Sequence, residues 1–133
     1  MIYLDASALV TVVVERQHAR ALRTFLDEHA LDKTCTSTIG FLETVRTCDQ
    51  IGDFPNLMAT LLRDHNEIKV SDAIRDGAAR VPGLVRALDA VHVASAEQLG
   101  SELTSLVTYD VRMAEAARKA GLPVAMPGAE QLS

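Results

Sequence analysis

The sequence predicts an α/β fold, a three-layer sandwich in which helices flank both faces of a central, mainly parallel sheet. Short runs of strand-forming residues alternate along the chain with longer segments of helical periodicity. Such alternation is typical of parallel sheets, whose strands are joined by helices that cross over one face. The chain has 133 residues, which is typical of one domain, and we expect residues 1–133 to form a single domain.

The predicted strands are short and mostly apolar. The first, Ile2–Leu4, combines β-branched, aromatic and aliphatic residues and ends at Asp5. The others are placed by similar runs at residues 33–37, 68–70, 106–108 and 123–126.

The predicted helices fill the segments between these strands. A first helix runs through Val14 after a cap at Asp5 or Ser7, and Ser71 caps a helix that ends before Pro82. Gly100 and Gly121 end two further helices, because glycine readily adopts the left-handed conformation that follows a helix. These two helices are residues 84–99 and 110–120, and the other segments with helical spacing are 17–29, 38–50 and 54–62.

One apolar stripe allows two interpretations. Its side chains recur at i, i+3, i+4, i+7 and i+8, and they are Phe54, Leu57, Met58, Leu61 and Leu62. Ordinary core packing explains such a stripe, and so does a groove that receives a helix of a partner protein.

Composition excludes several classes of protein. Thirteen basic and eighteen acidic residues give a net charge of −5, unlike proteins that bind nucleic acid by bulk attraction. The longest near-apolar run, residues 8–14, is too short for a membrane span of roughly 20 residues. The N-terminus lacks the pattern of a secretory signal, and Cys35 and Cys48 lack metal-ligand spacing. We therefore expect a cytoplasmic protein without a membrane partner.

Two aspartates directly follow predicted strands. Asp5 follows the first strand and Asp110 lies two residues after the strand 106–108. Ligands of open parallel sheets bind outside the carboxyl ends of the strands. Neighbouring strands lie about 4.8 Å apart, so two such carboxylates can share one ion. Each aspartate alone is equally explained as a helix cap.

Two further acids lie within predicted helices. Asp89 has Val85, Val93 and Ala96 as helical neighbours, and a carboxylate on an apolar face is costly unless it is paired or bound to a metal. A salt bridge to Arg86 or a hydrogen bond to His92 would also satisfy it. Glu43 follows Phe41 and Leu42, and the alternative for this residue is a solvated pair with Arg46.

The set of four carboxylates favours a metal site. Two unit charges about 4 Å apart repel by roughly 4 kcal/mol at an effective dielectric constant near 20. A cluster of four would therefore need a cation. Oxygen ligands without histidine or cysteine favour Mg²⁺ or Mn²⁺ over zinc.

Four segments together resemble the PIN-domain ribonucleases, and among them the VapC toxins of bacterial VapBC toxin–antitoxin modules. They are YLDASALV, GFLETVR, ALDAVHVASA and VTYDVRM, in that order. The resemblance extends from residue 2 to about residue 126 and implies a PIN-like fold. It also implies Mg²⁺- or Mn²⁺-dependent cleavage of RNA phosphodiester bonds at a catalytic metal site of Asp5, Glu43, Asp89 and Asp110.

The resemblance assigns roles to further residues. Ser7 and Thr108 match small hydroxyl positions beside the first and last acids, and Arg46 and Arg112 match basic positions that line the site. All four are expected to bind substrate. It assigns no firm role to His92. The predicted function is that of an endoribonuclease toxin that cleaves structured RNA, such as tRNA or rRNA, and so inhibits translation. The alternatives are a housekeeping PIN-type RNA-processing nuclease and a non-catalytic module that binds metal or RNA.

The resemblance also implies partners. These are a cognate VapB-type antitoxin, whose chain covers the acidic cleft, and a second copy of the chain in a homodimer. Only five aromatic side chains are present, so recognition of RNA by stacking of many bases is not expected.

Overall fold

The fold is taken from a computed structural model, which describes residues 1–130. Its strands are β1 (Ile2–Leu4), β2 (Thr34–Ser37), β3 (Asn66–Ile68), β4 (Ser105–Val107) and β5 (Val124–Ala125). Its helices are α1 (Ala6–Val14), α2 (Ala19–Glu28), α3 (Thr38–Ile51), α4 (Leu57–Asp64), α5 (Asp72–Ala78), α6 (Ala87–Glu97) and α7 (Val111–Lys119). A short 3₁₀ helix, Gly100–Glu102, follows α6. Among the described residues, no helix has the length and apolar character needed to cross a bilayer.

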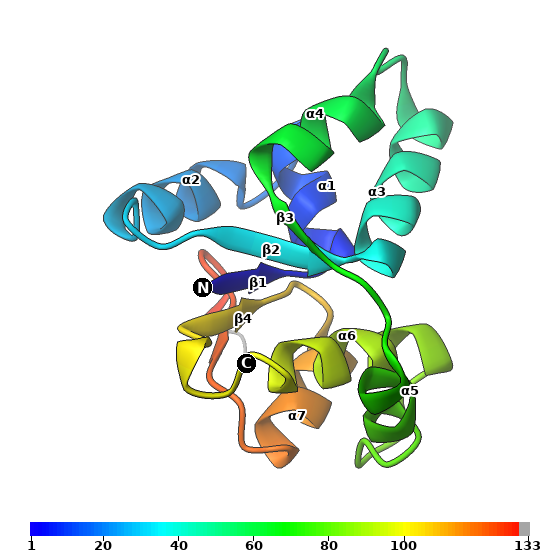
Figure 1. The fold of residues 1–133 in the computed structure, drawn as a ribbon. Helices are drawn as coiled ribbons and strands as arrows, with labels where there is room; N and C mark the ends of the chain where they lie inside the picture. The colour runs from blue at the N-terminus through cyan, green and yellow to red at the C-terminus, as the bar shows by residue number, and fades with distance from the viewer. Residues whose placement is uncertain (131–133) are drawn as a thin grey trace.

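The five strands form one parallel sheet in the order β3-β2-β1-β4-β5. Figure 1 shows α1 to α4 on one side of this sheet and α5, α6 and α7 on the other. The α/β sandwich with a central parallel sheet is therefore confirmed. The predicted boundary of the domain includes residues 131–133, which lie outside the described residues.

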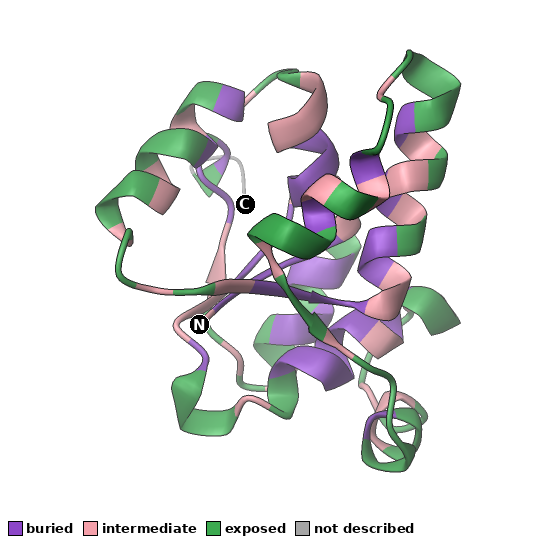
Figure 2. Ribbon diagram, turned by 45° about the horizontal axis from the view of Figure 1, so that its top comes forward, coloured by how far each residue is buried: buried purple, intermediate pink, exposed green. Residues whose placement is uncertain are grey.

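Alternating side chains of β1 divide the core between the two faces. Ile2 and Leu4 pack with residues of α1, α2, α3 and α4, whereas Tyr3 packs with residues of α6 and α7. This follows from the two-residue period of a strand, which points successive side chains to opposite faces. Figure 2 shows buried residues along the central strands and on the helix faces that cover them.

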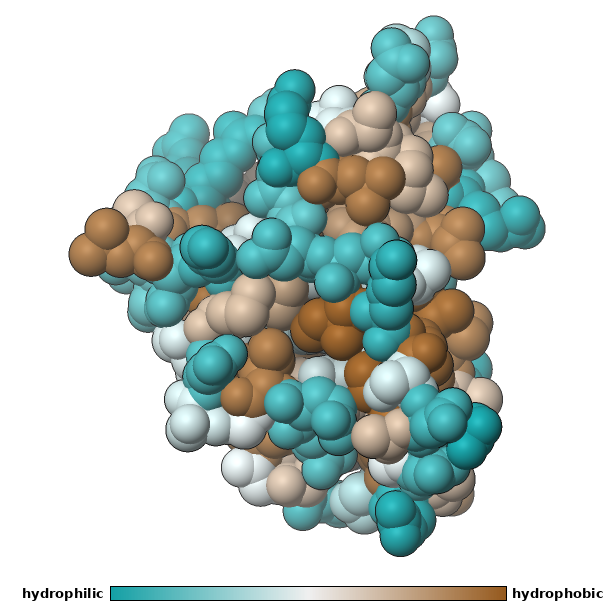
Figure 3. All heavy atoms as spheres, viewed as in Figure 1, coloured by the Kyte–Doolittle hydropathy of each residue, from teal (hydrophilic) through white to brown (hydrophobic). Residues whose placement is uncertain are grey.

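The apolar stripe on α4 is core packing. Leu57 and Leu61 are buried in the cluster beneath α1 and α3, and Phe54 and Met58 pack against it. The interpretation of the whole stripe as an open docking groove is therefore wrong, although Leu62 is exposed. Figure 3 shows hydrophilic side chains over the outer helices and hydrophobic atoms gathered between the two helix layers.

Two predicted boundaries are wrong for identifiable reasons. The third strand lies at Asn66–Ile68, two residues before its predicted place, because it is an exposed edge strand that apolar residues do not mark. The helix predicted from Leu84 begins at Ala87. Gly83 adopts a φ of 95° and Arg86 is extended, so the chain turns before the helix starts, and Leu84 is fully solvent-exposed.

Candidate active site

The candidate site lies where the order of the strands reverses. The chain runs from β1 outward to β2 and β3, then returns to place β4 on the other side of β1. Open α/β sheets bind ligands in the crevice at this switch point. Asp5 directly follows β1, and Asp110 follows β4 after two intervening residues, so both acids stand at the edge of the sheet where a ligand is expected.

Asp5 is a buried carboxylate held by three donors. Only 2% of the surface of this residue is exposed to solvent. The Ser7 hydroxyl donates to Oδ1 at 2.6 Å and the Ala8 amide donates to the same oxygen at 2.9 Å. The Thr108 hydroxyl donates to Oδ2 at 2.5 Å. Burial raises the pKa of Asp5, while its hydroxyl and amide donors act in the opposite direction.

The predicted cap at Asp5 is present as well. The hydrogen bond from the Ala8 amide caps α1, so the position next to the strand serves the helix and the site together. Of the two caps considered for this helix, Asp5 forms it. The Ser7 hydroxyl is engaged with Asp5 instead and also accepts a hydrogen bond from the Tyr109 amide at 2.9 Å.

Thr108 connects the first and last aspartates. While its hydroxyl donates to Asp5, the same oxygen accepts a hydrogen bond from the Asp110 amide at 3.0 Å. The Asp110 carboxylate caps α7, accepting from the Arg112 amide at 2.9 Å and the Met113 amide at 3.3 Å. The pairing of β1 with β4 explains this link, because Leu4 lies opposite Val107 and the next residues along both strands therefore meet.

Asp89 faces Asp110 across a cavity of about 470 Å³. Both acids line it together with Arg86, Arg112 and residues 84–85 and 111. The Arg86 Nε donates to Oδ2 of Asp89 at 3.3 Å, so the predicted salt bridge is present. The alternative hydrogen bond between Asp89 and His92 is not formed, because the two ring nitrogens of His92 contact Tyr3 and Glu43 instead.

Glu43 is linked to His92 rather than to Arg46. The Glu43 Oε1 lies 2.7 Å from Nε2 of His92, a residue that is 1% exposed. The other ring nitrogen, Nδ1, lies 2.7 Å from the Tyr3 hydroxyl, which accepts a hydrogen bond from the Ser37 amide at 3.2 Å. Burial raises the pKa of Tyr3 above its ordinary value, so the hydroxyl keeps its proton. Sequence analysis assigned His92 no role, although a buried histidine needs partners for both nitrogens.

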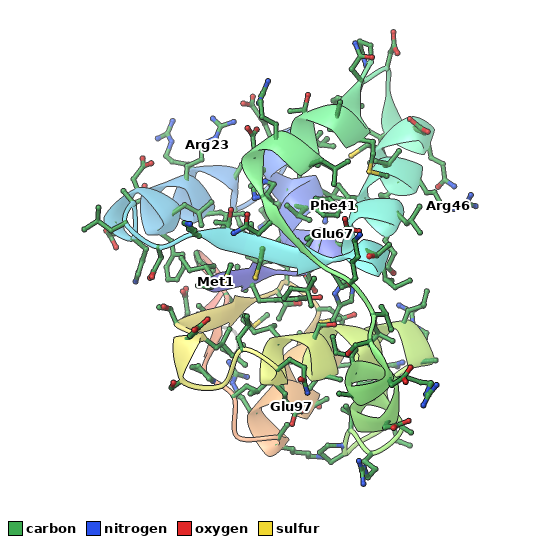
Figure 4. All side chains as sticks on the ribbon, viewed as in Figure 1. Met1, Arg23, Phe41, Arg46, Glu67 and Glu97 are labelled. Carbon is green, nitrogen blue, oxygen red and sulfur yellow. The ribbon has the colours of Figure 1, made fainter. Side chains whose placement is uncertain are left out.

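The predicted arginines differ in their surroundings. Arg112 is exposed and lines the cavity between Asp89 and Asp110. Arg46 lines a separate surface pocket of about 420 Å³ with Glu43, and Figure 4 shows its side chain extending outward from α3. The sequence does not indicate a role for Arg16, whose guanidinium donates to the Ser7 carbonyl and to Thr11 Oγ1, both at 3.2 Å. No pattern in the sequence indicates that a residue after α1 folds back towards the start of that helix.

The four acids do not form the closed cluster that the sequence predicts. Within residues 1–130, no three histidine, cysteine, aspartate or glutamate side chains are close enough together to hold an ion. The described contacts give the physical reason. Each carboxylate turns to its own donor: Asp5 to hydroxyls, Asp89 to Arg86, Asp110 to the amides of α7 and Glu43 to His92. Mutual repulsion favours such separation.

The donor set nevertheless fits a hard divalent cation. Asp5 is buried, yet its three donors are two hydroxyls and an amide, all of them neutral. A buried carboxylate without a cationic partner is costly. Glu43, Asp89 and Asp110 likewise offer only oxygen ligands, which Mg²⁺ and Mn²⁺ prefer, and Mg²⁺ retains several waters that extend the reach of a carboxylate.

Comparisons with known proteins identify the family of the chain. Residues 2–119 match the family model of the PIN domain. The chain is 35% identical to ribonuclease VapC47 of Mycobacterium tuberculosis, an alignment that covers 97% of this chain and 98% of the relative. It is 36% identical to ribonuclease VapC35 and 33% identical to ribonuclease VapC46 of the same organism, with at least 95% of each chain covered.

Solved structures support the same fold. FitAcB from Neisseria gonorrhoeae superimposes with a TM-score of 0.70 over 96% of this chain and 98% of that chain, at 18% identity. FitAB bound to an IR36 DNA fragment gives a TM-score of 0.68 over 94% of both chains, at 17% identity. Together, the match of the family model over most of the chain and the identity to full-length relatives place this chain in the PIN domain family, among the VapC ribonucleases.

Proposed function

We propose that this chain is a metal-dependent endoribonuclease and the toxin of a toxin–antitoxin pair. It hydrolyses phosphodiester bonds in structured RNA, such as tRNA or rRNA, and so inhibits translation. The observation that carries the proposal is Asp5, a buried carboxylate at the switch point of the sheet whose hydrogen-bond donors are all neutral. The names of the VapC relatives support the same activity.

Asp5, Asp89 and Asp110 would hold a Mg²⁺ or Mn²⁺ ion, and Glu43 would bind a water or a second ion. When bound, such an ion neutralises phosphate charge and makes a bound water more acidic. Hydrolysis forms one bond from a water oxygen to phosphorus and breaks one ester P–O bond, and the leaving oxygen takes up a proton. Ser7 and Thr108 keep both oxygens of Asp5 in a fixed orientation through their hydroxyl groups.

The arginines of the site provide contacts for phosphate groups. Arg112 lines the cavity of Asp89 and Asp110, and a guanidinium can bind two phosphate oxygens at once. Arg46, on the same surface as Glu43, would contact a flanking phosphate. The net charge of −5 disfavours binding by bulk attraction. We therefore expect selection by RNA shape, with an exposed loop as the substrate.

An antitoxin and a second copy of the chain are the expected protein partners. The surface around the acids exposes apolar side chains, with Leu42 46%, Leu88 48% and Val111 55% exposed. Exposed apolar residues beside a charged site are suited to contact with a protein segment. A VapB-type antitoxin that covers this surface would exclude RNA from the acids. The proposed location of both proteins is the cytoplasm, where structured RNA is present.

A cleavage assay with purified protein and labelled tRNA tests the function. Asp5→Asn should abolish cleavage, as should EDTA added to the wild-type protein, while circular dichroism shows an unchanged fold. Asp27→Asn, on the exposed face of α2, is the matched control and should cleave at the wild-type rate. Cleavage by Asp5→Asn at the wild-type rate would contradict the assignment. Equal cleavage of every single-stranded RNA would contradict the proposed selectivity for structure.

A further inference from the structure

We propose that His92 is a positioning residue, which together with Tyr3 fixes the orientation of the Glu43 carboxylate. The proposal rests on the function proposed above, because it concerns the same site. His92 stands on α6 three residues after Asp89, and Glu43 stands on α3. The imidazole lies between Glu43 and Tyr3, at 2.7 Å from each, and is 1% exposed.

The orientation of the ring follows from the donors and acceptors around it. The Ser37 amide can only donate, so the Tyr3 oxygen accepts from it. The Glu43 carboxylate can only accept, so the ring carries a proton on Nε2, and Nδ1 lies beside the Tyr3 hydroxyl. Nε2 therefore donates to the Glu43 carboxylate. A ring flip would place carbon atoms opposite Glu43 and Tyr3, so both hydrogen bonds select one orientation.

Glu43 needs such a partner more than Asp5 does. Asp5 has a short side chain and three donors. Glu43 has one more rotatable bond, and its side chain is 30% exposed to solvent. The bond from His92 takes up Oε1 and selects one arrangement of this longer side chain. The other oxygen, Oε2, takes no part in that bond, so it can receive a water or an ion.

The packing around His92 holds α3 close against α6. Gly40 precedes Glu43 by about one turn of α3, and a Cβ atom added at Gly40 would lie 3.2 Å from Cε1 of His92. The absence of a side chain at Gly40 thus brings the backbone of α3 against the imidazole. Tyr3, from the central strand, contacts the imidazole in an edge-on arrangement and is itself fully buried. A chain of contacts thus runs from Tyr3 on β1 to His92 on α6 and on to Glu43 on α3, and it holds the Glu43 side chain in place.

Two substitutions of His92 separate positioning from simple core packing. In His92→Gln, the terminal amide nitrogen takes the place of Nε2 and can donate to Glu43. In His92→Asn, the shorter amide takes the place of Nδ1 next to Tyr3 and does not reach Glu43. Both variants bury a polar amide of similar character at one position, so they form a matched pair.

Steady-state cleavage of tRNA and thermal unfolding are measured for both variants at saturating Mg²⁺. His92→Asn should lower kcat about tenfold or more with little change in KM, as expected for loss of a residue that orients a ligand. His92→Gln should recover kcat to within about threefold of the wild type. Equal kcat values for the two variants, or values that merely follow their unfolding temperatures, would overturn the proposal.

A second measurement needs neither RNA nor metal. In the metal-free protein, nitrogen-15 NMR of labelled histidine should show His92 with its proton on Nε2, protected from exchange with solvent. Glu43→Gln should shift that proton signal, and Glu97→Gln, exposed at the end of α6, should leave it unchanged. An unprotected proton, or one that does not respond to Glu43→Gln, would refute the hydrogen bond.

The two proposals fail in different ways. If Asp5→Asn abolishes cleavage while His92→Asn retains the wild-type kcat, the positioning role is refuted and the function stands. If the wild-type protein cleaves no RNA, the role of His92 in cleavage falls together with the proposed function.

Discussion

Thr108 donates its hydroxyl proton to Oδ2 of Asp5 at 2.5 Å, although 103 positions separate the two residues in the chain. The bond crosses from the end of β4 to the end of β1, at the point where the order of the strands reverses. Because the same oxygen accepts from the Asp110 amide, one hydroxyl fixes the relation between two of the proposed metal ligands.

Loss of this hydroxyl should therefore destabilise the fold. Thr108→Val keeps the shape of the side chain, but it removes a donor from Asp5 and an acceptor from the Asp110 amide. We expect the free energy of unfolding to fall by about 1–3 kcal/mol, since buried polar groups lose their partner. Urea denaturation measures this change. Thr108→Ser retains the hydroxyl and should lose distinctly less stability, and equal losses for both variants would contradict the prediction.

Removal of Arg86 should strengthen metal binding. The Arg86 side chain is 82% exposed and its guanidinium lies 3.3 Å from Asp89, so the ion pair contributes only about 0–1 kcal/mol to stability. Arg86→Ala frees the carboxylate and removes a positive charge that competes with a cation. Affinity for Mn²⁺, followed by electron paramagnetic resonance, should rise up to about fivefold.

Arg75→Ala provides the control for that measurement, because Arg75 forms comparable exposed ion pairs with Asp72 and Asp76 on α5. It should leave the affinity for Mn²⁺ unchanged. Weaker binding of Mn²⁺ by Arg86→Ala would show that Arg86 supports the site instead of competing with the ion.

Local sequence predicted the residues at the end of β1 and β4 because each strand is an apolar run that stops at, or shortly before, an aspartate. Topology then places both aspartates at one edge, as the alternation of strands and helices implies. The link from His92 to Glu43 spans 49 positions and depends on how α6 packs against α3. No local pattern contains that information.

The remaining differences have equally physical origins. The edge strand β3 is exposed, so hydrophobicity does not locate it. Leu84 continues the apolar spacing of α6 four residues before Leu88, so the pattern extended the predicted helix into the loop that precedes it, where Leu84 is exposed. The sequence predicted that the four acids share one site, and charge repulsion then implied a cation there, whereas the fold provides each acid with a donor of its own.

Gly40 should be intolerant of a side chain. A Cβ atom there would lie 1.9 Å from Oγ1 of Thr36, so either the Thr36 side chain or the backbone of α3 would have to move. Gly40→Ala should lower the free energy of unfolding by about 1–3 kcal/mol through overpacking. Thr36→Ala removes the obstructing hydroxyl, so adding Gly40→Ala to that background should cost less. A double-mutant cycle in urea measures the coupling, and strict additivity would contradict the predicted clash.

Asp5→Asn should render the metal-free protein less sensitive to pH. Burial raises the pKa of Asp5 above its unfolded value of 3.8, so folding disfavours the charged form. The stabilising contribution of the protonated acid is complete below about pH 3.8 and is lost as pH rises through the folded pKa. As pH rises from 4 to 7 the wild type therefore loses part or all of this contribution, whereas the neutral amide of Asp5→Asn does not titrate. In EDTA, the stability of Asp5→Asn relative to the wild type should increase from pH 4 to pH 7.

Mg²⁺ should then raise the unfolding temperature of the wild type and leave that of Asp5→Asn unchanged, because a ligand stabilises only the state that binds it. Thermal unfolding at both pH values, with and without Mg²⁺, measures these differences. A relative stability that falls as pH rises would show that the hydroxyl donors outweigh burial. An equal response of both proteins to Mg²⁺ would place the ion away from Asp5.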